Sequence, residues 1–104
     1  MPASFGVNTV HDAFNTEVLS VTTSSKGTTQ AARTNNTFEA EYALISVELG
    51  TIYWRCDGVT ATSSQGHSMT SGGTVELRGS NNVARFNAAT TAGGTATLMV
   101  TYAV

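Results

Sequence analysis

The chain has 104 residues and a formal net charge of −2, and charged residues make up only 12% of it. That share is about half of the roughly 25% typical of globular domains, and 18 threonines, 10 serines and 10 glycines supply most of the polar character instead. The five scattered lysines and arginines exclude the basic surface of a nucleic-acid-binding protein, and no apolar run is long enough to cross a membrane.

The first 15 residues carry no apolar periodicity, so we predict a flexible N-terminal arm over 1–15 and a single β-sandwich domain over 16–104. One interpretation of the arm is a frayed end, and the other is an anchor to a neighbouring subunit. The anchoring residues would be Phe5, Val7, Val10 and Phe14. The chain shows no secretory signal pattern and has one cysteine, Cys56, so we expect assembly in a reducing host cytoplasm.

Residues 16–23 predict the first strand, with Leu19 and Val21 on one face because side chains alternate along a strand. A polar loop follows over 24–37, which is long for a small domain, and such loops often carry interactions. We therefore expect Lys26 and Arg33 in this loop to contact a partner.

Residues 38–49 hold the longest apolar pattern, and its phase changes within the segment. The apolar residues from Phe38 to Leu44 follow one alternation, and those from Ile45 to Leu49 follow the other. A single strand with a β-bulge near Leu44–Ile45 would accommodate the change. The alanine and glutamate content leaves a helix as the alternative.

Residues 51–57 predict a strand that ends in a tight turn at Asp57-Gly58. Ile52, Trp54 and Cys56 would face inward, and Tyr53 and Arg55 outward. Tyr53 and Arg55 are therefore candidate partner-binding residues. Tyr53 beside Trp54 would suit a stacking platform for a carbohydrate. Arg55 would suit a buried ion pair between subunits, with a glutamate such as Glu48 or Glu76, and an exposed ion pair is the alternative.

Three further strands are predicted over 74–78, 83–86 and 95–103, with loops over 59–73 and 87–94 between them. The whole pattern predicts an all-β fold, an antiparallel β-sandwich or small barrel, jelly-roll-like, with six to eight short strands. The predicted core consists of Leu19, Val21, Tyr42, Leu44, Val47, Ile52, Trp54, Val75, Leu77, Phe86, Leu98, Val100 and Tyr102.

Motifs for chemistry are weak. Asp57, Ser63 or Ser64, and His67 have the composition of a nucleophilic triad, but a triad is defined by geometry, and the chain lacks a Gly-x-Ser-x-Gly elbow. The candidate metal ligands lack the usual close spacing. They are His11, Asp12, Cys56, Asp57 and His67. We therefore predict that the chain is not an enzyme and uses no cofactor or metal.

The second half of the chain resembles a recurrent pattern in small virion proteins of tailed bacteriophages, over residues 52–102. The matching segments are Arg55-Cys-Asp-Gly58, Ala61-Thr62, Gly66-His-Ser-Met69, Gly73-Thr-Val-Glu-Leu77, Gly79, Val83-Ala-Arg-Phe86 and Ala96-Thr-Leu-Met-Val-Thr-Tyr102. Ala61 stands where the pattern often has proline, and Asn87 and Ala89 depart from its usual arginine and isoleucine.

This resemblance implies a β-rich virion component that decorates or cements the capsid head. The expected partner is the major capsid protein or another virion protein, the expected assembly is a homotrimer, and the expected location is the virion. A fibre, neck or tail component is one alternative. A lectin-like carbohydrate-binding module that uses Tyr53 and Trp54 is the other.

Overall fold

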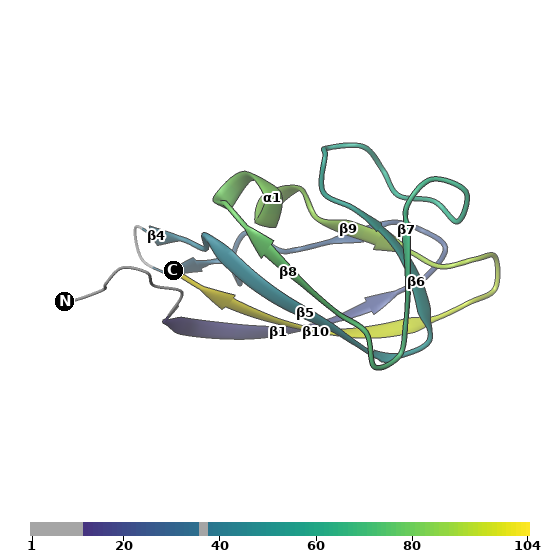
Figure 1. The fold of residues 1–104 in the computed structure, drawn as a ribbon, viewed down its shortest axis with the longest axis horizontal. Helices are drawn as coiled ribbons and strands as arrows, with labels where there is room; N and C mark the ends of the chain where they lie inside the picture. The colour runs from purple at the N-terminus through teal and green to yellow at the C-terminus, as the bar shows by residue number, and fades with distance from the viewer. Residues whose placement is uncertain (1–11, 36–37) are drawn as a thin grey trace.

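Two antiparallel four-stranded sheets packed face to face form the protein (Figure 1). The structure is a computed structural model that describes residues 12–35 and 38–104. The first sheet has the order β1-β10-β5-β8, with β1 Ala13–Val21, β10 Ala96–Ala103, β5 Tyr42–Leu49 and β8 Thr74–Arg78. The second has the order β2-β9-β6-β7, with β2 Lys26–Gly27, β9 Asn87–Ala89, β6 Thr51–Arg55 and β7 His67–Thr70. A short ribbon of β3 (Thr34–Asn35) and β4 (Phe38–Glu39) and the helix α1 (Ser80–Arg85) complete the described elements.

The chain pairs with itself as if folded in half. Strands β1, β2, β5 and β6 of the first half pair with β10, β9, β8 and β7 of the second half, all antiparallel. The pairs β10–β5 and β9–β6 then join these ribbons into the two sheets. This nested order is that of a jelly roll. The predicted all-β sandwich is confirmed, and the described strands do not close into a barrel.

Strand β10 lies inside the first sheet, between β1 and β5. Its predicted alternation is confirmed, since Leu98, Val100 and Tyr102 are fully buried while Met99 is exposed. The opposing sheet contributes Ile52 and Ala88 to the same core. Because each larger core side chain contributes about 1.5–3 kcal/mol on burial, the stability of the sandwich depends heavily on this central strand.

Most of the predicted core is buried, but two of its three β5 members, Tyr42 and Leu44, are in the wrong phase. Leu44 is 38% exposed and Tyr42 half-buried, whereas Ala43 and Ile45 are fully buried. The predicted bulge near Leu44–Ile45 is absent, because β5 pairs in continuous register with β8 and β10 there. The phase changes earlier, at the break between β4 and β5. Two other members of the predicted core, Trp54 and Val75, are half-buried against it. The remaining members are buried as predicted, namely Leu19, Val21, Val47, Ile52, Leu77, Phe86, Leu98, Val100 and Tyr102.

The strand predicted over 83–86 is also wrong, because Ser80–Arg85 form helix α1. Gly79 precedes the helix with φ of 97°, a conformation that favours glycine. Val83 and Phe86 are both fully buried, and their separation of three residues places them on one side of a helical turn. In a strand these two residues would face opposite sides, so their common burial fits the helical turn and not the predicted strand.

Predicted loops and boundaries also differ from the observed elements. Strand β1 begins at Ala13 rather than at residue 16, and residues 13–15, predicted in the arm, belong to it. The loops predicted over 24–37, 59–73 and 87–94 contain β2 and β3, β7, and β9 respectively. These strands are two to four residues long, too short for an alternation to be recognised in the sequence.

On the outward side of the first sheet, a group of uncharged side chains forms a surface that we call the outer patch, and the charged Glu48, Glu76 and Arg78 lie beside it on the same side of the sheet. The residues of the patch are Thr16, Val18 and Ser20 of β1, Thr97, Met99 and Thr101 of β10, and Leu44 and Ser46 of β5. Among the described residues, no helix or loop lies over this side of the sheet (Figure 1), whereas the loop after β6 lies over the second sheet. None of the described helices is long and apolar enough to span a bilayer.

Substitutions at two neighbouring positions of β10 test the assignment of its two faces. Leu98→Ala should lower the free energy of unfolding by about 2–5 kcal/mol, because it removes buried methyl groups and leaves a cavity. Met99→Ala, on the outer patch, should change it by less than about 1 kcal/mol. Urea unfolding followed by circular dichroism measures both, and equal losses would contradict the assignment.

Candidate functional site

The carboxyl end of β6 brings together most of the chain's unusual side chains. Trp54 lies directly across from His67 on β7 and Ala88 on β9. The Trp54 and His67 rings are 4.9 Å apart between centroids and tilted by 42°, and Phe86 lies 6.0 Å from Trp54. Trp54 is half-buried against the core and His67 is exposed, so the pair forms a partly open aromatic wall.

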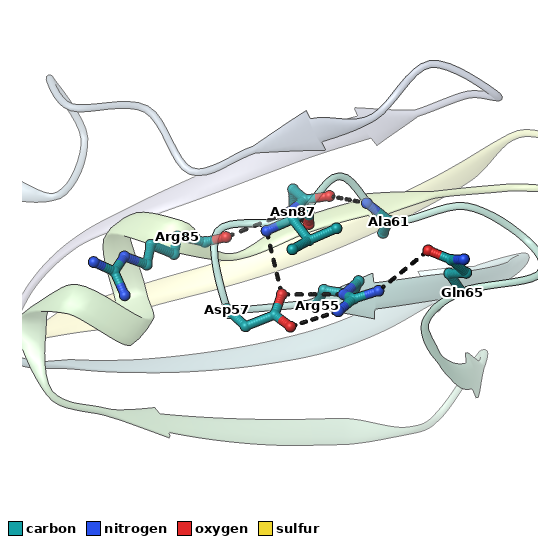
Figure 2. A network of polar contacts seen from close by, with 7 residues as sticks. Arg55, Asp57, Ala61, Gln65, Arg85 and Asn87 are labelled. Atoms are coloured by element: carbon teal, nitrogen blue, oxygen red, sulfur yellow. Dashed lines mark hydrogen bonds and ion pairs between the residues drawn. The ribbon is translucent and has the colours of Figure 1, made fainter.

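Arg55 and Asp57 form a two-pronged ion pair next to this wall (Figure 2). The Arg55 Nε and Nη2 atoms donate to the two carboxylate oxygens of Asp57 at 3.0 and 2.5 Å. Asp57 also accepts the backbone N–H of Val59 at 3.2 Å, and Arg55 Nη1 lies 3.5 Å from Gln65 Oε1. The two residues are only two positions apart, so the pair holds the predicted turn at Gly58, where φ is 87°.

This pairing changes the electrostatics of both groups. The hydrogen bonds from Arg55 lower the pKa of the Asp57 carboxyl to about 2, with a smaller contribution from the Val59 N–H. The same contact raises the pKa of Arg55. Asp57 is therefore ionised at neutral pH and remains a hydrogen-bond acceptor. Within the chain Arg55 pairs with Asp57, and a pair with Glu48 or Glu76 of another subunit stays a prediction.

Asn87 fixes the loop that follows this turn. Its Oδ1 accepts the N–H of Ala61 at 2.6 Å and the hydroxyl of Ser25 at 2.7 Å, and its Nδ2 donates to the carbonyls of Val59 and Arg85 at 3.0 and 3.3 Å. All four hydrogen-bonding positions of the amide are thus used. Figure 2 shows Asn87 above the Arg55–Asp57 pair. Sequence reasoning missed this residue, because no local pattern shows that an asparagine will hydrogen-bond a loop 26 residues away.

A pocket of about 320 Å³ lies at this end of β6. It is lined by Trp54, Arg55, Cys56, Asp57, Gly66 and His67. Cys56 is a free thiol that packs, half-buried, against the core. Tyr53 is not among these lining residues. It lies level with Ser68 and Ala89 and, as the neighbour of Trp54 in the strand, on the side of β6 opposite to the Trp54 ring. The stacking platform predicted from Tyr53 and Trp54 is therefore not formed.

The residues considered for a triad do not form one. Asp57 and His67 border the same pocket, but the Asp57 carboxylate is bonded to Arg55 and to a backbone N–H. The Ser64 hydroxyl is 3.2 Å from that of Thr62. Among the candidate metal ligands, His11 lies outside the described residues, and within residues 12–35 and 38–104 no three His, Cys, Asp or Glu side chains are grouped to hold an ion.

The predicted partner-binding residues are dispersed. Phe14 packs against the protein's own core, Lys26 is exposed on β2, and Arg33 is half-buried with its Nη1 donating to the Thr28 carbonyl at 3.0 Å. Tyr53 and Arg55 lie on β6. Phe5, Val7 and Val10 lie outside the described residues. The structure thus brings only Arg55 into the pocket.

A second polar cluster closes the other end of the sandwich. The buried Tyr102 hydroxyl donates to Glu17 Oε1 at 2.6 Å, and the Thr29 hydroxyl donates to Glu17 Oε2 at 2.7 Å. Burial and the contact with Glu17 raise the pKa of Tyr102. The cluster ties β1 and β10 to the 28–33 segment, and its side chains are already paired with one another. We interpret it as structural.

Comparison of the chain with protein-family models, with curated proteins and with solved structures finds no match.

The Arg55–Asp57 pair should be visible in the acid titration of the protein. Because the folded pKa of Asp57 is lowered from 3.8 to about 2, its stabilising contribution is complete above about pH 4 and is lost as the pH falls through about 2. Carboxyl carbon NMR should place its midpoint near pH 2. Arg55→Gln should move the midpoint toward 3.8, and the control Arg78→Gln, on β8, should not.

Asn87→Ala should loosen the loop that it holds. Removing an amide that satisfies several backbone groups should cost about 1–3 kcal/mol of unfolding free energy. Hydrogen exchange should accelerate first at the Ala61 amide, which donates to Asn87. Asn81→Ala, an exposed position on α1, is the matched control. An unchanged exchange rate at the Ala61 amide would contradict the role of Asn87 in holding this loop.

Proposed function

We propose that this chain is a structural subunit of a bacteriophage virion, a decoration or cement protein that binds the major capsid protein of the head as a homotrimer. The outer patch is the observation that carries the proposal. In this mechanism the subunit acts by contact. It binds only the assembled shell, and binding that is restricted to one state stabilises that state by mass action.

The outer patch has the features of a surface that is buried against protein. Cross-strand neighbours combine exposed apolar and hydroxyl side chains, with Val18 opposite Met99 and Leu44 opposite Thr101. Val18, Leu44 and Met99 are 57%, 38% and 36% exposed. Interface cores are depleted of charge, because an ionised group is costly to remove from water. None of the patch residues is ionisable, and the nearest carboxylates, Glu48 bonded to Ser46 at 2.6 Å and Glu76 opposite Leu44, lie beside the patch.

Charged side chains lie at the margin of the patch. Glu76 and Arg78 are on the neighbouring edge strand β8, where Arg78 Nη2 is 3.4 Å from Glu76 Oε1. The Tyr42 hydroxyl donates to Glu76, and the Arg78 guanidinium lies 5.8 Å from the Tyr42 ring centre. An apolar centre with a polar rim is the usual arrangement of a protein–protein interface.

Two further observations support the virion assignment. The resemblance of residues 52–102 to small virion proteins rests on turn and strand segments that include Asp57-Gly58. The jelly-roll order occurs in viral capsid domains. A fold of this kind hosts many functions, however, so the proposal depends on the exposed patch more than on the topology.

Head binding separates the proposal from its alternative, a fibre, neck or tail component. The tagged protein is mixed with purified tailless heads of the phage that encodes it, and bound protein is collected by sedimentation. Saturable binding to heads, together with a solution mass near three times 10.8 kDa, is the expected result. Binding to tails alone would establish the alternative.

Lysines introduced into the outer patch should remove head binding. The double variant Val18→Lys, Met99→Lys should bind heads at least about tenfold more weakly, since an ammonium group would be buried without a partner. Both positions are exposed, so its melting temperature should stay close to that of the wild type. Val59→Lys, at a position that is 45% exposed in the segment between β6 and β7, is the control. Wild-type binding by the double variant would overturn the role of the patch.

A further inference from the structure

The geometry points to a second binding function: the pocket between Trp54, His67 and the Arg55–Asp57 pair takes a neutral pyranose sugar. Its volume of about 320 Å³ is at the small end of the roughly 300–1,000 Å³ typical of ligand sites. A space of this size suits one or two sugar rings. The inference does not depend on the virion proposal, because the pocket lies on the second sheet and the outer patch on the first.

The aromatic wall provides the apolar half of such a site. A pyranose presents C–H groups on its ring faces and hydroxyls around its edge, so it is recognised by an aromatic surface with polar groups beside it. Trp54 and His67 supply aromatic surface at 4.9 Å from one another. Each also carries a ring N–H or nitrogen that can hydrogen-bond a hydroxyl.

The Arg55–Asp57 pair provides the polar half. A guanidinium has five N–H donors, and the hydrogen bonds found within the described residues use three of them, two to Asp57 and one long one to Gln65. Asp57 is ionised at neutral pH and its side chain is 55% exposed. A hydroxyl pair on a sugar can donate to the carboxylate and accept from the guanidinium simultaneously.

The charge balance favours a neutral sugar over an acidic one. Arg55 is 25% exposed and is compensated by Asp57 at 2.5 Å, whereas Asp57 is the more exposed member of the pair. An incoming sugar carboxylate would therefore meet a carboxylate before it reached the guanidinium. A neutral pyranose avoids this repulsion and keeps the existing ion pair intact.

The site is also preorganised, which lowers the entropic cost of binding. Asn87 and the Asp57–Val59 contact hold the loop beside the pocket. Gly66 lies so close to β6 that a Cβ atom there would be 3.1 Å from the backbone nitrogen of Trp54 and from the carbonyl carbon of Tyr53. A side chain at this position would push the pocket wall away from the strand.

The single tryptophan makes the pocket directly observable, because Trp54 is the only tryptophan of the chain. The full-length protein is titrated with the methyl glycosides of glucose, galactose and mannose, with N-acetylglucosamine, and with N-acetylneuraminic acid as the acidic probe. At least one neutral sugar should change Trp54 fluorescence saturably at concentrations up to about 50 mM, a range suited to millimolar affinity. In ¹H–¹⁵N spectra the shifts should centre on residues 54–57 and 66–67, including the indole N–H.

Variants connect the response to the proposed contacts. Asp57→Asn should weaken sugar affinity about tenfold or more, since a charged acceptor is lost, and Glu48→Gln, an exposed carboxylate on β5, should leave it unchanged. If Asp57→Asn unfolds, His67→Ala at the exposed wall takes its place, with the same expected loss. Absence of binding by every neutral sugar, binding of the acidic sugar alone, shifts that map outside the pocket, or wild-type affinity in the folded variants would each overturn the inference.

Discussion

The pairing of β10 with both β1 and β5 is the constraint on which the rest of this structure depends. It joins the last strand of the chain to the first and to the middle, at Leu19–Leu98 and Leu98–Val47. The other pairings of the jelly roll are nested within this one in the sequence. Strands β2, β5 and β6 follow β1, and their partners β9, β8 and β7 precede β10. Contacts this distant in sequence carry a large loop-closure cost, so a continuous buried face on β10 is needed to offset it.

The same topology explains where the candidate site lies. Strands β6 and β7 are the innermost of the nested pairs, and only one short segment of chain connects them. The end of β6 can therefore carry Trp54, Arg55 and the eleven-residue segment 56–66 without disturbing the core. Asp57 and Asn87 hold the first part of this segment, because their side chains satisfy backbone groups of Val59 and Ala61 that have no strand partner.

Sequence reasoning succeeded where burial has a clear period and failed where it does not. The alternation in 95–103 placed Leu98 and Val100 in the core correctly, since a strand buried on one side must repeat every two residues. It failed at Leu44, because the phase changes at the interruption between β4 and β5, and the residues there, Ala40 and Glu41, carry no glycine or proline signal. The site was partly predictable. The turn at Asp57-Gly58 was recognised, but the pairing of Arg55 with Asp57 was not, and Asn87 acts on a loop 26 residues away. Long-range hydrogen bonds of that kind leave no local signal.

The two proposed surfaces differ in the physics that makes each suitable for its role. The outer patch is uncharged and built on continuous strands, so its backbone is already satisfied and only side chains must be desolvated when a protein covers it. The pocket has a bonded ion pair and an aromatic wall, so it suits a small ligand that brings its own hydroxyls. Because the two occupy opposite sheets, a subunit held to a shell through Val18 and Met99 would keep Trp54 accessible. A single β-sandwich can thus be attached on one side while it binds on the other.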